Sequence, residues 1–181
     1  LYKKFYDEYG RLLKEGVYQD FDNKDSLIEL LRFKSTIKDS YVSLSDYVNR
    51  LGKDQKSIYY ITGNNEKTLR ESPLLEMYNK KKIEVLILDD EIDEIIMPAI
   101  PKYKDFELKA VNRSSAAEEF GDTKDNNEIK PVIKKIKSVL GDKVKDVKIS
   151  NRLSDSPSCI VADEDDPTAQ MQEILRATGQ Q

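Results

Sequence analysis

The sequence contains no histidine and only one cysteine among its 181 residues. Without imidazole there is no Ser-His or Cys-His nucleophile, no histidine general base and no histidine-ligated zinc, which excludes most hydrolase mechanisms. The lone Cys159 cannot form a disulfide within the chain, and this usage fits a reducing compartment. No apolar run approaches membrane-spanning length and no signal-peptide pattern opens the chain. We therefore expect a cytoplasmic protein that does not contact membranes.

Charge is abundant but nearly balanced, since 30 Lys and Arg face 34 Asp and Glu for a formal net charge of -4. This balance does not predict binding to nucleic acid or to an anionic membrane. Seven lysines between Lys130 and Lys148 could form a basic face. However, Glu128, Asp142 and Asp146 interrupt them and no aromatic residues interleave for base stacking, so a solvated helix face is favoured over a nucleic-acid site.

The most apolar part of the chain, residues 56–97, predicts a strand-helix-strand unit. Residues 58–62 form a β-branched and aromatic run and residues 85–88 a continuous apolar run, as expected for strands covered on both faces. Between them, Ser72 can cap a helix, and Pro73 suits the first turn because its missing N–H would be unpaired there. So short a crossover implies parallel strands with a right-handed connection.

Helical patterns precede this unit. Apolar residues at helical spacing predict a helix over residues 2–13 that Gly16 ends. Two capping boxes, one beginning at Ser26 and one at Ser43, predict two further short helices. We therefore expect three helices before the first strand of the unit.

The pattern changes twice after residue 88. The acidic residues from Asp89 to Glu94 fit the first turn of a helix, where the helix dipole favours negative charge. Alternating apolar residues predict a third strand over residues 105–111. The composition then turns polar over residues 112–128, and we place a domain boundary there.

Beyond this boundary, residues 129–140 carry a helical apolar stripe that Gly141 ends. Residues 144–149 and 159–161 predict two strands, and Asp166-Pro167 begins a last helix that ends near Gly179. The fold class is therefore α/β plus α+β. Its predicted parts are a short helical connector (1–52), a small three-layer α/β subdomain with a mainly parallel sheet (53–112), a linker (113–128) and the start of a small α+β domain (129–181).

Two groups of residues could carry chemistry. Asp89 and Asp90 follow a strand end, where α/β folds bind ligands and where paired acids hold Mg²⁺, so a Mg²⁺-dependent or phosphoryl-accepting domain is one alternative. That alternative needs a later strand with an acceptor Asp, and the chain runs into polar sequence instead. Helix N-terminal acids explain the same residues. Cys159 lies in an apolar strand without an imidazole neighbour, which favours a buried apolar role over a reactive thiol.

Several ordered motifs resemble one protein family. They are LRFKSTIKDSYVSLSDYVNRL (31–51), IYYITG (58–63), SPLLEMYNKKKIEVLILDDEIDE (72–94) and NRLSDSPSCIV (151–161). With these motifs the chain resembles the heat-shock protein 90 chaperones, and most of all their bacterial branch, high-temperature protein G. The resemblance runs from about residue 12 to residue 180 and implies the end of the middle domain followed by the start of the C-terminal domain.

The resemblance implies an ATP-driven, homodimeric chaperone that binds unfolded or partly folded client proteins. ATP and Mg²⁺ would belong to the parent protein, and no catalytic, cofactor-binding or metal-binding residue falls within this chain. The dimerising helices would follow Gln181. The chain also opens within a helical pattern without an initiating Met, so we expect an excised segment of a longer protein that is not itself an enzyme.

The last predicted helix carries the candidate binding residues. Met171, Ile174 and Leu175 lie at i, i+3 and i+4 and so share one face of an otherwise polar helix. By pattern alone they would be a core face. The resemblance implies instead an exposed apolar face that contacts clients, for which the flexible thioether of methionine is well suited. Pro167 stands where the family has a further Met, so the patch is expected to be smaller here.

Overall fold

The computed structural model describes residues 1–38, 40–53, 55–120, 128–163 and 166–179. A five-stranded sheet organises it, with the order β1-β3-β2-β5-β4. The central strands β2 (Ser57–Thr62), β3 (Val85–Leu88) and β5 (Phe106–Ala110) pair in parallel, as predicted. The edge strands β1 (Lys34–Ser35) and β4 (Lys102–Tyr103) pair antiparallel, which makes the sheet mixed. The predicted α/β class is confirmed.

The crossover from β2 to β3 contains more helix than predicted. It comprises α4 (Glu66–Arg70), the 3-10 turn η1 (Pro73–Leu75) and α5 (Glu76–Lys80). The Ser72 side chain accepts a hydrogen bond from the Leu74 amide and Pro73 occupies the first turn, as predicted. The missed helix α4 is capped by Asn65, whose side chain accepts from the Thr68 amide at 3.1 Å.

Three helices precede the unit, but two predicted boundaries are wrong. Helix α1 (Tyr2–Gln19) passes through Gly16, because Leu27 of the following helix packs against that glycine and a tertiary contact outweighs its weak helix propensity. Helix α2 (Lys24–Leu30) begins after Asn23, so Ser26 lies inside it and forms no capping box. In contrast, α3 (Leu44–Val48) has the complete capping box predicted at Ser43.

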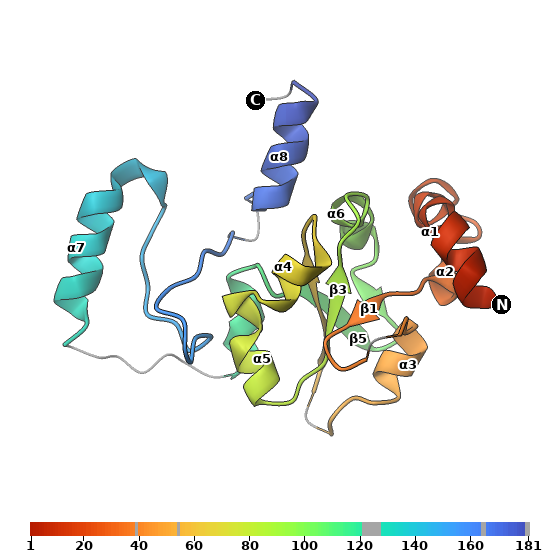
Figure 1. Ribbon diagram of the computed structural model, residues 1–181, viewed down its shortest axis with the longest axis horizontal. Coiled ribbons are helices and arrows are strands. Elements are labelled where there is room, and N and C mark those ends of the chain that lie inside the picture. Colours follow the sequence, from red (N-terminus) through yellow and green to blue (C-terminus); the bar gives the residue numbers. More distant parts are fainter. Residues whose placement is uncertain (39, 54, 121–127, 164–165, 180–181) are drawn as a thin grey trace.

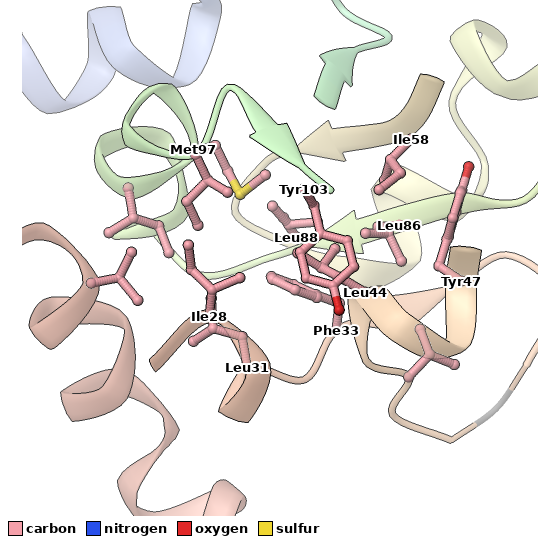
Figure 2. Packing of buried hydrophobic residues seen from close by; sticks show 14 of the residues in the cluster. Ile28, Leu31, Phe33, Leu44, Tyr47, Ile58, Leu86, Leu88, Met97 and Tyr103 are labelled. Carbon is pink, nitrogen blue, oxygen red and sulfur yellow. The ribbon is translucent and has the colours of Figure 1, made fainter. Parts of the chain in front are cut away.

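Apolar clusters cover both faces of the sheet and give the three predicted layers (Figure 1). One face packs on the N-terminal helices, on α6 (Asp93–Ile96) and on the 3-10 turn η2 (Met97–Ala99); Figure 2 shows Leu31, Leu44, Leu88 and Met97 meeting there. The other face packs on α4, α5 and Phe120. Residues 1–52 thus share a core with the sheet, and their separation as a connector stays a prediction.

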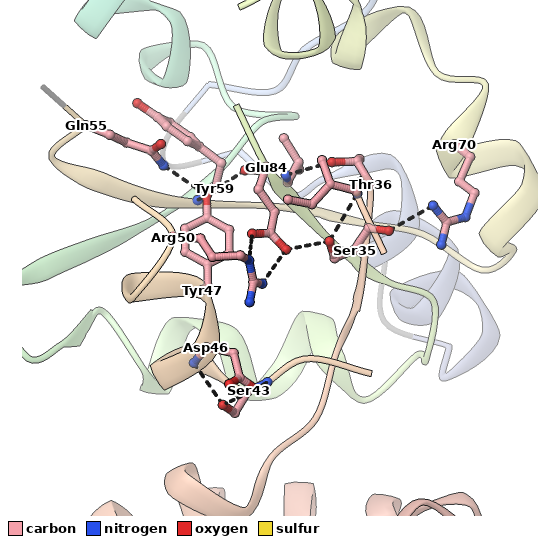
Figure 3. Close-up of polar contacts among 12 residues, drawn as sticks. Ser35, Thr36, Ser43, Asp46, Tyr47, Arg50, Gln55, Tyr59, Arg70 and Glu84 are labelled. Carbon is pink, nitrogen blue, oxygen red and sulfur yellow. Dashed lines mark hydrogen bonds and ion pairs between the residues drawn. The ribbon is translucent and has the colours of Figure 1, made fainter. Parts of the chain in front are cut away.

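A buried carboxylate fixes the amino end of β3. Glu84 accepts hydrogen bonds from the Ser35 hydroxyl at 2.5 Å and from Arg50 Nη2 at 2.8 Å (Figure 3). Its carbonyl oxygen accepts from the Tyr47 hydroxyl. These bonds join α3, β1 and β3, and they satisfy a charge that would be costly to bury alone.

Beyond β5 the described elements are η3 (Ser115–Phe120), α7 (Lys130–Leu140), η4 (Gly141–Lys143) and α8 (Ala169–Ala177). The helix predicted over 129–140 is confirmed, with Gly141 at its end. The strands predicted at 144–149 and 159–161 are wrong: these residues have no strand partner in the described chain, where a single bridge joins Ala162 to Arg113. A strand needs a partner to satisfy its backbone groups, and alternation alone does not supply one.

Candidate functional site

The carboxyl ends of β2, β3 and β5 meet at one edge of the sheet, where α/β folds place their sites. Polar groups from three other segments of the chain gather around Glu94 of α6. The Thr62 hydroxyl at the end of β2 donates to Glu94 Oε1 at 2.5 Å, and Asn112 Nδ2 donates to Thr62 Oγ1 at 3.1 Å. The Thr168 hydroxyl donates to the same Glu94 oxygen at 2.9 Å. Thr62, Glu94 and Thr168 are all buried.

Thr168 also starts the last helix. Its Oγ1 accepts a hydrogen bond from the Met171 amide at 3.1 Å, which makes it the N-cap of α8. The predicted start at Asp166-Pro167 is therefore two residues early. A Thr immediately before an apolar helical stripe is the sequence signal for this cap.

The predicted client-binding residues Met171, Ile174 and Leu175 all lie on α8, and each is partly exposed. None of them belongs to either buried cluster of the described chain. Figure 1 shows α8 rising from the sheet rather than lying on it. Their use in client binding stays a prediction.

The acids that suggested a metal site are engaged by lysines instead. Lys34 Nζ lies 2.7 Å from Asp89 Oδ2, and Lys14 Nζ lies 2.7 Å from Asp93 Oδ1 and 3.5 Å from Asp90 Oδ2. These side chains line a cavity of about 180 Å³ between α1, β1 and the loop after β3. Ammonium groups occupy the positions next to the carboxylates that Mg²⁺ would need, and no cluster of three metal-ligating side chains occurs among the described residues.

Burial shapes the acidity of one of these groups. The pKa of Asp93 is raised to about 6 by burial, and the nearby Lys14 ammonium lowers it only in part. The carboxylate is 1% exposed and Lys14 8% exposed, so this pair links α1 to α6 away from water. Asp93 was predicted as an ordinary helix N-terminal acid, and it does stand in the first turn of α6.

Two further side chains, Arg152 and Glu76, form hydrogen bonds between the segment before α8 and the α/β subdomain. The sequence analysis did not predict either of them. The buried Arg152 donates to the carbonyl oxygens of Val111, Arg113 and Ser114. The Glu76 carboxylate of α5 accepts from the amides of residues 154, 155 and 156 and from the Ser156 hydroxyl. Single charged residues far apart in sequence give no periodic signal.

Cys159 is half-buried beside the cluster that covers α4 and α5. Burial raises the pKa of its thiol. This favours the neutral, apolar role predicted for it, since the thiolate is the reactive form.

Comparison with known proteins identifies the family. The family described as "Hsp90 protein" matches residues 1–181, and the chain therefore belongs to the Hsp90 family. It is 53% identical to "Chaperone protein HtpG" of Treponema denticola over an alignment of 190 positions that covers 99% of this chain and 30% of that protein. A protein of the same name from Aliarcobacter butzleri is 49% identical, over 99% of this chain and 29% of that protein. The resemblance to the bacterial branch is confirmed.

A solved structure supports the same assignment. The middle domain of a putative heat shock protein of Plasmodium falciparum matches with a TM-score of 0.58 and 36% identity, over 61% of this chain and 47% of that one. The chain thus spans about 30% of the length of the curated relatives it matches. In the described part of the chain no helix is both long and apolar enough to cross a membrane.

Proposed function

We propose that this chain is the segment of an Hsp90-family chaperone that links the nucleotide-driven clamp to the dimer stem and contributes to binding unfolded client proteins. The parent protein would be a cytoplasmic, homodimeric ATPase that dimerises through segments after Gln181. ATP and Mg²⁺ would act elsewhere in the parent protein. The pairing of Asp89 and Asp93 with lysines supports this, because it leaves these carboxylates poorly suited to hold Mg²⁺.

The observation that carries this proposal is the position of α8. Its apolar face of Met171, Ile174 and Leu175 is partly exposed, while its N-cap residue, Thr168, donates a hydrogen bond to Glu94, which also accepts from Thr62 at the end of β2. A partly exposed apolar face, on a helix that is hydrogen-bonded to the rest of the fold, is suited to weak contact with unfolded proteins of varied sequence. A movement of the α/β subdomain would carry that face with it.

The helices α1, α2 and α3 share a core with the sheet, so we propose that residues 1–111 act as one lever. The polar segment 112–128, where the sequence places a domain boundary, follows this lever. Its first residues are bonded to the segment before α8: the Ser114 amide donates to Ala162 O and the Ala162 amide to Asn112 O. Helix α7 takes no part in these bonds and has no buried residue. We propose that α7 contacts other parts of the parent protein.

Client binding can be tested by sedimentation equilibrium of this chain with a partly unfolded model protein. We expect a monomer that binds the client, and weaker binding when Met171 and Leu175 are replaced by Ser. The matched control replaces Val132 and Val139 of α7, which are 54% and 72% exposed, by Ser. A stable dimer that ignores the client would overturn the proposal, because the face of α8 would then be a symmetric contact.

A further inference from the structure

A chain of hydrogen bonds runs from the sheet to the first turn of α8, and each donor and acceptor in it has a defined direction. Asn112 donates to Thr62, and Thr62 donates to Glu94. From the other side, the Met171 amide donates to Thr168 and Thr168 donates to Glu94. Both chains end on one oxygen, Glu94 Oε1, so this single atom holds β2 and α8 together.

We propose that Glu94 is a positioning residue for α8: by accepting the Thr168 hydroxyl it sets the direction in which the face of Met171, Ile174 and Leu175 points. The carboxylate is only 7% exposed, so it acts through Thr168 rather than by touching a client. The Thr168 hydroxyl has one proton, and giving it to Glu94 leaves the oxygen to accept the Met171 amide. One side chain therefore couples the capping of the helix to its attachment to the sheet.

Among the described residues, the bond to Glu94 is also the one hydrogen bond from α8 or its cap to the α/β subdomain, as the other bonds of α8 stay within residues 167–179. The nearest other attachment lies upstream of the cap, where Arg113 Nη1 donates to the carbonyl oxygens of Asp163 and Asp166. Without the bond to Glu94 the helix would keep its cap and this upstream attachment, but no bond would fix the direction of its first turn. The fraction of molecules with the apolar face presented correctly would then fall, and the apparent dissociation constant for a client rises in inverse proportion to that fraction. This consequence rests on the proposed client binding, whereas the effect on helix direction does not.

Two substitutions separate attachment from capping. Glu94→Met removes the acceptor but leaves Thr168 free to cap α8, and Glu94→Gln keeps an acceptor oxygen at the same place. Thr168→Val removes both roles, and Thr168→Ser restores both. The matched control is Thr178→Val at the other end of α8, whose hydroxyl bonds only to carbonyl oxygens of the same helix.

The direction of α8 can be measured by pulsed electron spin resonance between two nitroxide labels. The exposed Lys67 of α4 and Arg176 of α8 are changed to Cys, in a chain where Cys159 is replaced by Ser. We expect a narrow distance distribution in this parent, in Glu94→Gln, in Thr168→Ser and in Thr178→Val. We expect a broader one in Glu94→Met and Thr168→Val, and the same thermal unfolding of the sheet shows that each variant has folded.

An unchanged distribution in Glu94→Met overturns the proposal, and so does equal broadening in Thr178→Val.

The client affinity of the same variants is measured in parallel. A fall in the correctly directed fraction to about one third predicts an apparent dissociation constant about threefold higher. If the distribution broadens and client affinity does not change, Glu94 positions α8 but the proposed client role fails. If affinity falls without broadening, Glu94 does not act through helix direction and this inference is wrong.

Discussion

Arg152 Nη1 donates a hydrogen bond to the carbonyl oxygen of Val111 at 2.7 Å, across 41 residues of sequence. Val111 ends the sheet region and is fully buried, and Arg152 is 3% exposed. The second nitrogen, Nη2, reaches the carbonyl oxygens of Arg113 at 2.5 Å and Ser114 at 2.6 Å. One guanidinium group therefore satisfies three carbonyl groups of the segment that leaves the sheet.

Replacing Arg152 should loosen this connection. Arg152→Gln is too short to reach all three carbonyl oxygens, and a buried acceptor left unpaired costs about 1–3 kcal/mol. We expect the free energy of unfolding to fall by about 2–4 kcal/mol, measured by urea denaturation. The control Arg176→Gln, at an exposed position of α8, should change it by less than about 0.5 kcal/mol. Equal effects of the two substitutions would contradict a structural role for Arg152.

Tyr47 provides a second test of a buried polar contact. Its hydroxyl donates to Glu84 O at 2.5 Å and accepts from the Tyr59 amide at 3.1 Å, and the residue is 1% exposed (Figure 3). The hydroxyl also accepts from Gln55 Nε2 at 3.0 Å. Tyr47→Phe keeps the ring but removes these three bonds, so we expect a loss of about 1–3 kcal/mol in unfolding free energy. Tyr18→Phe on the exposed side of α1 is the matched control. A loss in the control as large as in Tyr47→Phe would refute this account.

Local patterns predicted the local features of this fold. The apolar runs gave β2 and β3 because both strands are covered on both faces, and the Ser43 box gave α3 because all of its bonds lie within four residues. What failed depended on distant partners. Gly16 stays helical because Leu27 packs on it, and residues 144–149 form no strand because no partner strand lies beside them in the described chain.

The candidate site divides in the same way. The face of Met171, Ile174 and Leu175 was predicted from helical spacing together with a family resemblance, and its spacing on α8 holds. Glu94 and Arg152 were not predicted as anchors, because their partners lie 74 and about 40 residues away in sequence. Thr168 could have been found, since an N-cap is a local signal.

Glu76 should make the attachment of residues 154–156 sensitive to acid. The Ser156 hydroxyl and then the neighbouring amides lower the pKa of Glu76 to about 2, below its ordinary value of 4.5. Its contribution is therefore present above about pH 4.5 and is lost as the pH falls towards 2. We expect faster hydrogen exchange of these amides at pH 3 than at pH 6, after correction for intrinsic rates. Glu76→Gln should remove this difference, and persistence of the difference in that variant would exclude Glu76 as its source.

The pairing of Asp89 with Lys34 predicts that the chain does not bind Mg²⁺ at this edge of the sheet. A lysine ammonium 2.7 Å from the carboxylate supplies the positive charge that a cation would bring. Titration calorimetry with Mg²⁺ should show no saturable heat, and Asp89→Asn should not alter the trace. A saturable heat that Asp89→Asn abolishes would instead restore the Mg²⁺-dependent alternative.

Asp93 should make the protein less stable as the pH rises, whereas Glu76 makes it less stable as the pH falls. Burial raises its folded-state pKa to about 6, above the ordinary 3.8, so between these values the folded protein binds a proton that the unfolded chain has released. Its contribution is therefore fully present below about pH 4 and is lost as the pH rises to 6. A shift of about two units corresponds to about 2–3 kcal/mol.

Lys14, Asp90 and Tyr6 face this carboxyl group, and Asp93→Asn keeps its shape while removing its titration. The free energy of unfolding is measured by urea denaturation at pH 4 and at pH 6.5. The part of it that is lost on going from pH 4 to pH 6.5 should be smaller in Asp93→Asn than in the parent. Asp90→Asn is the control, since Asp90 is more exposed and lies 3.5 Å from Lys14 rather than 2.7 Å. If Asp93→Asn leaves the pH dependence unchanged while Asp90→Asn alters it, the titrating group of the α1–α6 contact is Asp90.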